Sequence, residues 1–304
     1  MTFVYCSTVC VINVLSNMDA KDNKNAGNMM IKCADKLIDL STPLVMGIVN
    51  ITPDSFYPGS RVTEQVKLLS RIQTFISEGV DIVDIGAVST RPGAESVPEE
   101  IEMSRMKHAL KLIVKHFPNI LISVDTFRSS VARMAVGEGA HIINDVSGGD
   151  RDSRMFDVVA ELNVPYILMH SRGESKTMQE LTEYENVTLD VIRELSDKVL
   201  TMRQMGVKDV IVDPGFGFAK TTEQNFKLLA ELSLLEVLGC PVLAGISRKS
   251  MIYKTFNVGP MEALNGTTAL NMTALMNGSQ ILRVHDVKEA REVVVLYQTL
   301  MRSI

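Results

Sequence analysis

The sequence lacks an excess of positive charge, a long apolar run and a regular set of cysteines. Its 304 residues include 31 Lys and Arg against 36 Asp and Glu, a net charge of -5, whereas nucleic-acid-binding surfaces are normally basic. No apolar run reaches the roughly 20 residues that a membrane-spanning helix needs. The 4 cysteines have spacings typical of neither a disulfide framework nor a zinc site. We therefore expect no nucleic-acid partner, no membrane span and a cytoplasmic location.

The first 35 residues differ in composition from the rest of the chain. Residues 3–15 are apolar, but they lack the positive start and the small-residue cleavage site of a secretory signal. A polar tract at residues 19–28 follows. We expect residues 1–35 to be a flexible or mis-started extension, a signal or anchor being the less favoured alternative. We expect residues 36–304 to form one domain.

Short apolar runs and amphipathic helical segments alternate from residue 43 onward. Gly79 and Gly139 each end a helical segment just before an apolar run, as a repeated helix-to-strand turn requires. Eight such repeats in about 260 residues predict an α/β fold, a (β/α)8 TIM barrel. An open doubly wound sheet is the alternative with the same local pattern. The expected strands are residues 45–50, 81–86, 121–125, 141–145, 166–170, 210–213, 242–247 and 281–285.

Apolar residues recur at helical spacing in the segments 64–78 and 99–116, which we expect to pack against the strands. The expected faces are Val66, Leu69, Ile72 and Ile76 in the first segment, and Ile101, Met106, Ala109 and Ile113 in the second.

Polar side chains stand where the expected strands end, and in barrels this end carries the active site. Burying such groups without partners costs several kcal/mol each, so they must pair with one another or face a ligand. For any single residue a satisfied core network is an equally good explanation, but the whole ring predicts a functional site. The ring consists of Asn50, Asp84, Asp125, Asn144, Asp145, His170, Asp213, Ser247, Arg283 and His285.

The residue types in this ring indicate the ligand. Asp125, Asn144 and Asp213 can form hydrogen bonds in the plane of a flat heterocycle, and a carboxylate matches the guanidine-like edge of a 2-amino-4-oxopteridine. The segment 247–250, Ser-Arg-Lys-Ser, begins a helix and offers amides, a hydroxyl and an amine to an anion. Arg283 and His285, two apart on a strand, point the same way. The ring therefore predicts a site for a polar heterocycle beside an anion.

Seven short segments follow one another between residues 43 and 302, namely Asn50–Phe56, Ser89–Ala94, Ser123–Thr126, Ile143–Val146, Asp213–Phe218, Gly245–Ser250 and Arg283–Asp286. In this order they resemble the signatures of dihydropteroate synthases. The resemblance implies a TIM-barrel transferase of folate biosynthesis that joins (7,8-dihydropterin-6-yl)methyl diphosphate to 4-aminobenzoate, with Mg²⁺ as cofactor and a homodimer as the assembly. The apolar last helix, with Val293, Val294, Tyr297, Leu300 and Met301, is a candidate dimer interface, although packing on the barrel explains it equally well.

The resemblance also implies a role for each matched residue. The pterin is held by Asp125, Asn144, Asp213, Lys249 and Arg283. The diphosphate is held by Asn50, Arg283 and His285, with Asn50 also at the metal. The 4-aminobenzoate pocket is formed by Thr90, Arg91, Pro92, Phe218 and Ser250. Catalysis is assigned to Asp125, Lys249, Arg283 and His285, which assist departure of the diphosphate and stabilise the resulting cation without a covalent enzyme nucleophile.

Two positions depart from the family pattern, and both fall in long loops that we expect to act as lids. Pro58 stands where members often carry an acidic residue, and Val88 interrupts a loop that commonly reads Gly-Gly-Glu/Gln-Ser-Thr. A weakened or non-catalytic pterin-binding paralogue is therefore an alternative. A pterin-dependent methyltransferase should lack the Ser-Thr-Arg-Pro-Gly and Ser-Arg-Lys-Ser segments, which are present, and a Schiff-base aldolase acting through Lys249 is a third alternative.

Overall fold

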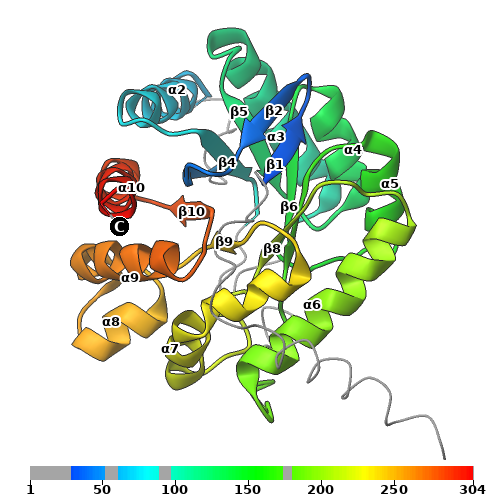
Figure 1. Ribbon diagram of the computed structural model, residues 1–304. Coiled ribbons are helices and arrows are strands. Elements are labelled where there is room, and N and C mark those ends of the chain that lie inside the picture. The colour runs from blue at the N-terminus through cyan, green and yellow to red at the C-terminus, as the bar shows by residue number, and fades with distance from the viewer. Residues whose placement is uncertain (1–28, 52–60, 89–96, 174–179, 304) are drawn as a thin grey trace, which may run out of the picture.

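The computed structural model of the chain describes residues 29–51, 61–88, 97–173 and 180–303. Its main feature is an 8-stranded parallel sheet in the order β8-β7-β6-β5-β4-β3-β10-β9. Val212 of β8 forms a bridge with Val242, just before β9, so the two edges of the sheet meet and the barrel closes. Helices form a ring around the strands (Figure 1). The expected (β/α)8 barrel is confirmed, and the open sheet is not observed.

The strands agree with the expected ones to within one residue, with one exception. The expected strand 242–247 shrinks to Leu243–Ala244, because the amide of Lys249 bonds to the carbonyl of Ile246 (3.1 Å) and the chain turns there. The strands are β3 (Leu44–Asn50), β4 (Ile82–Gly86), β5 (Leu121–Asp125), β6 (Ile142–Asp145), β7 (Tyr166–Met169), β8 (Val210–Asp213), β9 (Leu243–Ala244) and β10 (Ile281–Val284).

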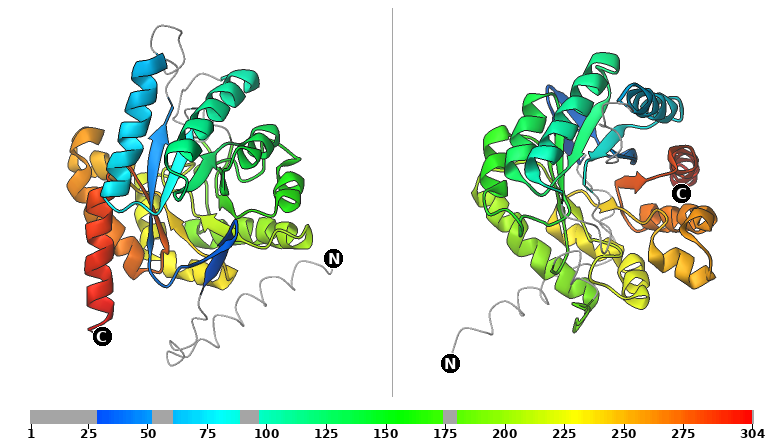
Figure 2. Two further views of the ribbon diagram at one scale, coloured as in Figure 1. Left: turned by 90° about the horizontal axis from the view of Figure 1, so that it is seen from above. Right: turned by 180° about the vertical axis from the view of Figure 1, so that it is seen from behind.

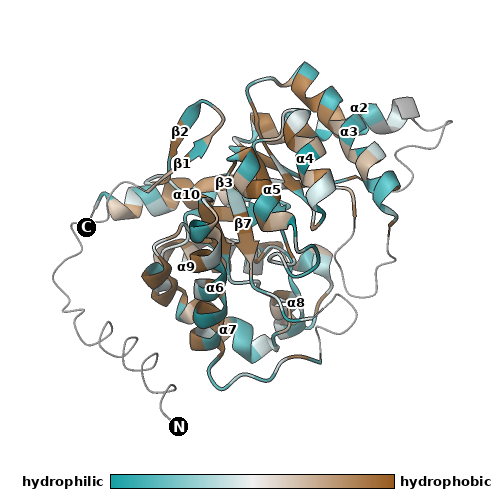
Figure 3. Cartoon of the chain, turned by 90° about the vertical axis from the view of Figure 1, so that its right-hand side faces the viewer, coloured by the Kyte–Doolittle hydropathy of each residue, from teal (hydrophilic) through white to brown (hydrophobic). Residues whose placement is uncertain are grey.

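The helices bury one side against the strands, and in Figure 3 the strands β3 and β7 are brown while teal lies on the helices. The expected faces are partly wrong, because Val66 (61 % exposed) and Ile101 (43 % exposed) point outward, and Phe75 and Leu110 take the inner positions. The helices are α2 (Arg61–Ser77), α3 (Glu99–His116), α4 (Ser129–Gly137), α5 (Met155–Leu162), α6 (Val187–Gln204), α7 (Thr222–Ala230), α8 (Ser250–Phe256), α9 (Leu264–Met276) and α10 (Val287–Met301).

Local sequence sets where several of these helices begin and end. The side chain of Asn186 accepts from two amides at the start of α6, and Thr221 forms a capping box with Gln224 at the start of α7. The chain reverses after α2 and α4 at Gly79 and Gly139, whose positive φ angles of 87° and 102° favour glycine. No helix among the described residues is long and apolar enough to cross a lipid bilayer.

An antiparallel hairpin, β1 (Met30–Cys33) and β2 (Lys36–Asp39), covers the amino-terminal end of the barrel. Figure 2 shows the hairpin at this end. Ile31 and Cys33 are buried among the first residues of the strands, namely Leu44, Met46, Ile82, Ile142, Ile167, Ile211, Leu243 and Ile281. The expected boundary between residues 35 and 36 falls inside this hairpin, and residues 1–28 lie outside the described residues.

Candidate active site

The polar ring expected from the sequence forms at the carboxyl end of the barrel. Strand register places Asp125 between Gly86 of β4 and Asn144 of β6, and it places Met169 beside Asp213. Asp125, Asn144 and Asp213 are each no more than 9 % exposed, so they face the barrel interior. Gly86 leaves space beside them, because a Cβ there would lie 3.5 Å from Asn50 Oδ1 and 3.7 Å from Asp125 Cβ.

Arg283 on β10 joins two acids from the other side of the barrel. Its Nε donates to Asp84 Oδ2 at 2.7 Å, and its Nη2 donates to Asp125 Oδ2 at 2.8 Å. Asn144 Nδ2 donates to the same oxygen of Asp84 at 3.1 Å. Asp84 thus bonds to two expected pterin-binding residues, although the roles inferred from the sequence did not include it. Its place in the polar ring was the signal that could have identified it. Asp84 Oδ1 is buried and has no hydrogen-bond partner among the described residues.

The charges of this cluster are set by burial and by mutual attraction. Burial raises the pKa of Asp125 to about 7, and Arg283 opposes this shift while Asp84, Asp145 and Glu102 add to it. Burial lowers the pKa of Arg283, but its two carboxylate partners outweigh that effect, so the pKa is raised overall. The guanidinium is therefore always charged, whereas Asp125 can change its proton near neutral pH. Such a group in an enclosed site is typical of a functional residue.

A second cluster brings Asp213 and Lys249 together beside Phe218. Burial lowers the pKa of Lys249 to about 8, against the attraction of Asp213. The Lys249 amine donates to the carbonyl of Phe216 and lies 4.7 Å from the centroid of the Phe218 ring. Gly245 borders both clusters, since a Cβ there would lie 3.8 Å from Asp213 Oδ2 and 4.0 Å from Arg283 Cβ. The expected pterin-binding residues therefore surround one part of the barrel interior.

His285 belongs to a third group near the end of β10. Its Nδ1 lies 3.0 Å from Ser247 Oγ, and its backbone amide donates to the same oxygen at 3.1 Å. Arg71 of α2 donates to the carbonyl of His285 at 2.9 Å. Arg248 turns away, because it forms two 2.8 Å bonds to Asp286. In the Ser-Arg-Lys-Ser segment, Ser247 contacts His285 and Lys249 belongs to the second cluster, whereas Arg248 pairs with Asp286.

Two residues of the expected arylamine pocket, Phe218 and Ser250, belong to the described part of the chain. Thr90, Arg91, Pro92 and also Pro58 lie outside the described residues. Ser250 is the first residue of α8 and directly follows Lys249, which puts it next to the second cluster. Thus Phe218 and Ser250 are near Lys249, while the remainder of the pocket stays a prediction.

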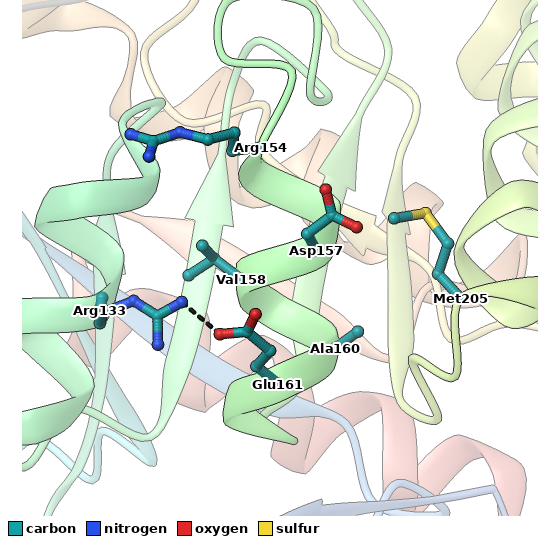
Figure 4. A pocket seen from close by; sticks show the side chains of 7 residues that line it. All are labelled: Arg133, Arg154, Asp157, Val158, Ala160, Glu161 and Met205. Atoms are coloured by element: carbon teal, nitrogen blue, oxygen red, sulfur yellow. Dashed lines mark hydrogen bonds and ion pairs between the residues drawn. The ribbon is translucent and has the colours of Figure 1, made fainter.

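One hollow lies elsewhere, on the outside of the barrel between α4 and α5. Figure 4 shows that Arg133 and Glu161 pair across it, with Arg154 and Asp157 nearer the other end of α5. Its residues come from outer helices and from Met205 after α6, not from strand ends. Because barrel chemistry takes place at the carboxyl ends of strands, we assign no catalytic role to this hollow.

Comparison with known proteins agrees with this geometry. A family model described as pterin binding enzyme matches residues 46–285. The chain belongs to this family. The expected pterin-binding residues Asp125, Asn144, Asp213, Lys249 and Arg283 all lie inside the matched segment.

Individual relatives of this pterin binding enzyme are dihydropteroate synthases. The one from Escherichia coli (strain K12) is 41% identical over 257 residues, which are 84% of this chain and 90% of the relative. The Yersinia pestis dihydropteroate synthase in a sulfonamide drug complex has a TM-score of 0.84 at 36% identity, covering 91% of this chain and 100% of that one. The Xanthomonas albilineans enzyme in complex with 7,8-dihydropteroate has a TM-score of 0.78 at 34% identity, covering 90% and 98%.

Proposed function

We propose that this chain condenses (7,8-dihydropterin-6-yl)methyl diphosphate with 4-aminobenzoate to give 7,8-dihydropteroate and diphosphate. The observation that carries the proposal is the buried Arg283 cluster beside Lys249 and Asp213, in a chain similar over most of its length to dihydropteroate synthases. Asp125 and Asp213 bind the guanidine-like edge of the pterin, Asn144 bonds to its ring, and Lys249 and Arg283 flank it.

The same cluster supplies the electrostatics of a dissociative displacement. The C–O bond to the diphosphate breaks first, which leaves a pterin-methylene cation, and the nitrogen of the arylamine then forms the new C–N bond and loses a proton. Two carboxylates, Asp84 and Asp125, face one guanidinium, so the cluster has negative charge with which to stabilise that cation. Arg283 and His285 interact with the departing diphosphate together with Asn50. The site residues therefore bind and stabilise, and none has to form a bond to carbon.

The residues at this end of the barrel fit Mg²⁺ only together with a phosphate ligand. Asn50 presents an amide oxygen near Asp125, and Mg²⁺ usually takes one or two protein oxygens and completes its shell with substrate phosphates and water. The described residues contain no group of three or more His, Cys, Asp or Glu that could hold a metal alone. Mg²⁺ held by Asn50 would neutralise charge on the diphosphate.

We propose that Phe218 and Ser250, next to Lys249, form the arylamine pocket together with Thr90, Arg91 and Pro92. The Phe218 ring offers a flat apolar wall, and its neighbours Lys249 and Ser250 offer an ammonium and a hydroxyl to the benzoate carboxylate.

We also propose a homodimer that forms through the outward side of α10. Val293 and Val294 are buried against the barrel, as the packing explanation required, whereas Val295 (53 % exposed) and Leu296 (62 % exposed) point outward. Leu296→Glu should convert a dimer to monomers in light scattering, and a wild-type monomer would contradict the proposal. A cytoplasmic location accords with Cys33 and Cys240, which are buried free thiols.

The test is an assay of the purified chain with dihydropterin methyl diphosphate, 4-aminobenzoate and Mg²⁺, following diphosphate release and dihydropteroate formation. Product should require both substrates and should vanish when a chelator removes the metal. Pterin binding without product would favour the non-catalytic paralogue, and restoring polar residues at Pro58 and Val88 would be the next step. A covalent adduct trapped by borohydride would instead indicate Schiff-base chemistry at Lys249.

A further inference from the structure

The chain between β8 and α7, residues 214–220, has an unusual backbone that we call the β8–α7 turn. Gly215, Gly217 and Ala219 have positive φ angles of 71°, 80° and 48°. Only glycine fits the first position, because a Cβ there would lie 1.9 Å from the carbonyl oxygen of His170. A turn of this kind leaves several carbonyls without partners in a helix or sheet, so it needs other donors.

Two lysines supply these donors from separate positions. Lys249 donates to the carbonyl of Phe216. Lys220 donates to the carbonyls of Gly215 and Phe218, both at 3.1 Å, and its third contact is Nδ1 of His170 at 3.0 Å. The three contacts use all three donors of an ammonium group. Lys220 thus bonds to one carbonyl before and one carbonyl after the carbonyl of Phe216 that is bound by Lys249.

Lys220 is 4 % exposed, and burial lowers its pKa to about 7 against the attraction of Asp213, so its ammonium form needs compensation. His170 connects it to a carboxylate, because Nε2 lies 3.0 Å from Glu194 Oε2. When Lys220 is an ammonium, Nδ1 of His170 accepts from it, and Nε2 then carries the proton that is donated to Glu194. Burial raises the pKa of Glu194, but bonds from His170 and Arg172 lower it to about 2, so a full negative charge stands at the far end.

The chain of contacts returns to the same turn. The Arg172 guanidinium lies 3.9 Å from the centroid of the Tyr184 ring, and the Tyr184 hydroxyl donates to the carbonyl of Ala219 at 3.0 Å. Lys220, His170, Glu194, Arg172 and Tyr184 therefore form a closed set of contacts behind the turn, which we call the turn network. All donors of the Lys220 amine are used within the protein, so this residue has none left for a substrate.

We propose that Lys220, supported by His170 and Glu194, is a positioning residue that fixes the β8–α7 turn so that Phe218 and Lys249 present the correct wall to the arylamine. The inference rests on the proposed function, because Phe218 is the part of the turn assigned to 4-aminobenzoate. The backbone of Asp213 is held by the strand ladder, and its carboxylate also accepts from the Gly215 amide of the turn at 2.8 Å. We therefore expect pterin binding to depend on the turn, but less than arylamine binding does. A displacement of about 1 Å in a substrate-binding wall is enough for a large loss.

The experiment compares Lys220→Met, His170→Asn and Glu194→Gln with the control Lys198→Met. Lys198 also donates to a glycine carbonyl, that of Gly148 at 2.9 Å, but it lies outside the turn network. For each variant we would measure kcat, KM for 4-aminobenzoate, the Kd of 6-hydroxymethylpterin, and amide hydrogen exchange of residues 214–220.

Lys220→Met should raise KM for 4-aminobenzoate about tenfold or more, with a change in pterin Kd below about threefold and faster exchange in the turn. Glu194→Gln should give a smaller change of the same kind, and Lys198→Met should resemble the wild type. His170→Asn keeps a hydrogen-bond acceptor for Lys220, so its KM for 4-aminobenzoate should lie between those of Lys220→Met and Lys198→Met.

An unchanged KM in Lys220→Met, or an equal loss of pterin and arylamine binding, would overturn the inference. If Lys220→Met does not fold, the same criteria apply to His170→Asn and Glu194→Gln. If the wild type makes no dihydropteroate, the proposed function fails. Amide hydrogen exchange then decides the inference. An exchange rate in the β8–α7 turn that is the same in Lys220→Met as in the wild type overturns it.

Discussion

The two ends of this barrel are built from the same strands but contain opposite kinds of side chain. At the carboxyl end, Asp84, Asp125 and Arg283 form a buried charged cluster. At the amino end, the first residues of the strands are apolar and Ile31 of the β1–β2 hairpin covers them. One end therefore contains buried polar groups, and the other end is closed by apolar packing.

At the amino end, the polar side chain of Asp81 forms its hydrogen bonds and its ion pair within the protein. Asp81 accepts from the amide of Val45 at 2.7 Å and pairs with Arg291. At the carboxyl end, by contrast, Asp84 Oδ1 is buried without a partner among the described residues, and burial raises the pKa of Asp125. Unused hydrogen-bonding capacity costs stability, and it is what an incoming ligand can satisfy. We therefore expect changes at the carboxyl end to act on activity and changes at the amino end to act on stability.

The largest effect is expected from Asp125→Asn. Removing the charge should lower kcat/KM by about a hundredfold or more, because in the proposed reaction the carboxylate pairs with the pterin and stabilises the cation. The melting temperature should change little, since the amide keeps the shape and avoids the cost of a buried charge. Steady-state kinetics and thermal unfolding would measure both quantities. The matched control is Asp157→Asn in the outer hollow, and comparable activity losses in the two variants would refute the contrast.

Ile31→Ala tests the amino end. Ile31 is 1% exposed, and loss of its buried side chain should lower the free energy of unfolding by about 2–4 kcal/mol. The kinetic constants at 25 °C should stay near those of the wild type. Leu37→Ala in the same hairpin is the control, because Leu37 is 68% exposed and should change stability by less than about 0.5 kcal/mol. Lost activity with unchanged stability would contradict the division of roles.

The pH dependence sharpens the comparison, because ionisation of Asp125 should change the free energy of unfolding and the pterin affinity in opposite directions. Burial raises the pKa of Asp125 to about 7, although Arg283 opposes the shift, while an unfolded Asp titrates near about 4. Between these values the folded state binds more protons, so the contribution of Asp125 to stability falls as the pH rises. Pterin affinity should instead rise over the same range, by up to about tenfold per pH unit, because the carboxylate is the form that binds.

Isothermal titration with 6-hydroxymethylpterin and urea unfolding between pH 5 and 8 would measure these two trends. The Asp125→Asn variant should flatten the trend in pterin affinity. Pterin affinity that is independent of pH in the wild type would show that Asp125 is already ionised at pH 5. The pairing with Arg283 would then outweigh burial.

The smallest effect is expected at the outer hollow. Arg133 and Glu161 form an ion pair whose side chains are 52% and 60% exposed, so solvent screens their attraction. Arg133→Ala should change the free energy of unfolding by less than about 0.5 kcal/mol and leave turnover unchanged. A clear loss of turnover would give this hollow a function that its position does not indicate.

Much of the fold could be predicted because its signals are local. Apolar runs, helical periodicity and glycines such as Gly79 repeat along the chain, and each depends on a few neighbouring residues. The hairpin β1–β2 was missed, since two strands of four residues give too short a pattern and Cys33 reads as part of a polar stretch. The inward positions of α2 and α3 were only partly predicted, since Phe75 is buried whereas Val66 is exposed.

The sequence by itself determined that a ring of polar residues lies at the carboxyl end, because parallel strands must all end on the same side. Only the tertiary structure decided which members of the ring meet. Arg283 and Asp84 are 199 residues apart and pair because β10 and β4 both flank β3. The contact of Lys220 with His170 likewise depends on β7 lying beside β8. No local pattern encodes such partners, since burial in a closed barrel, and not sequence distance, forces charged groups to find one another.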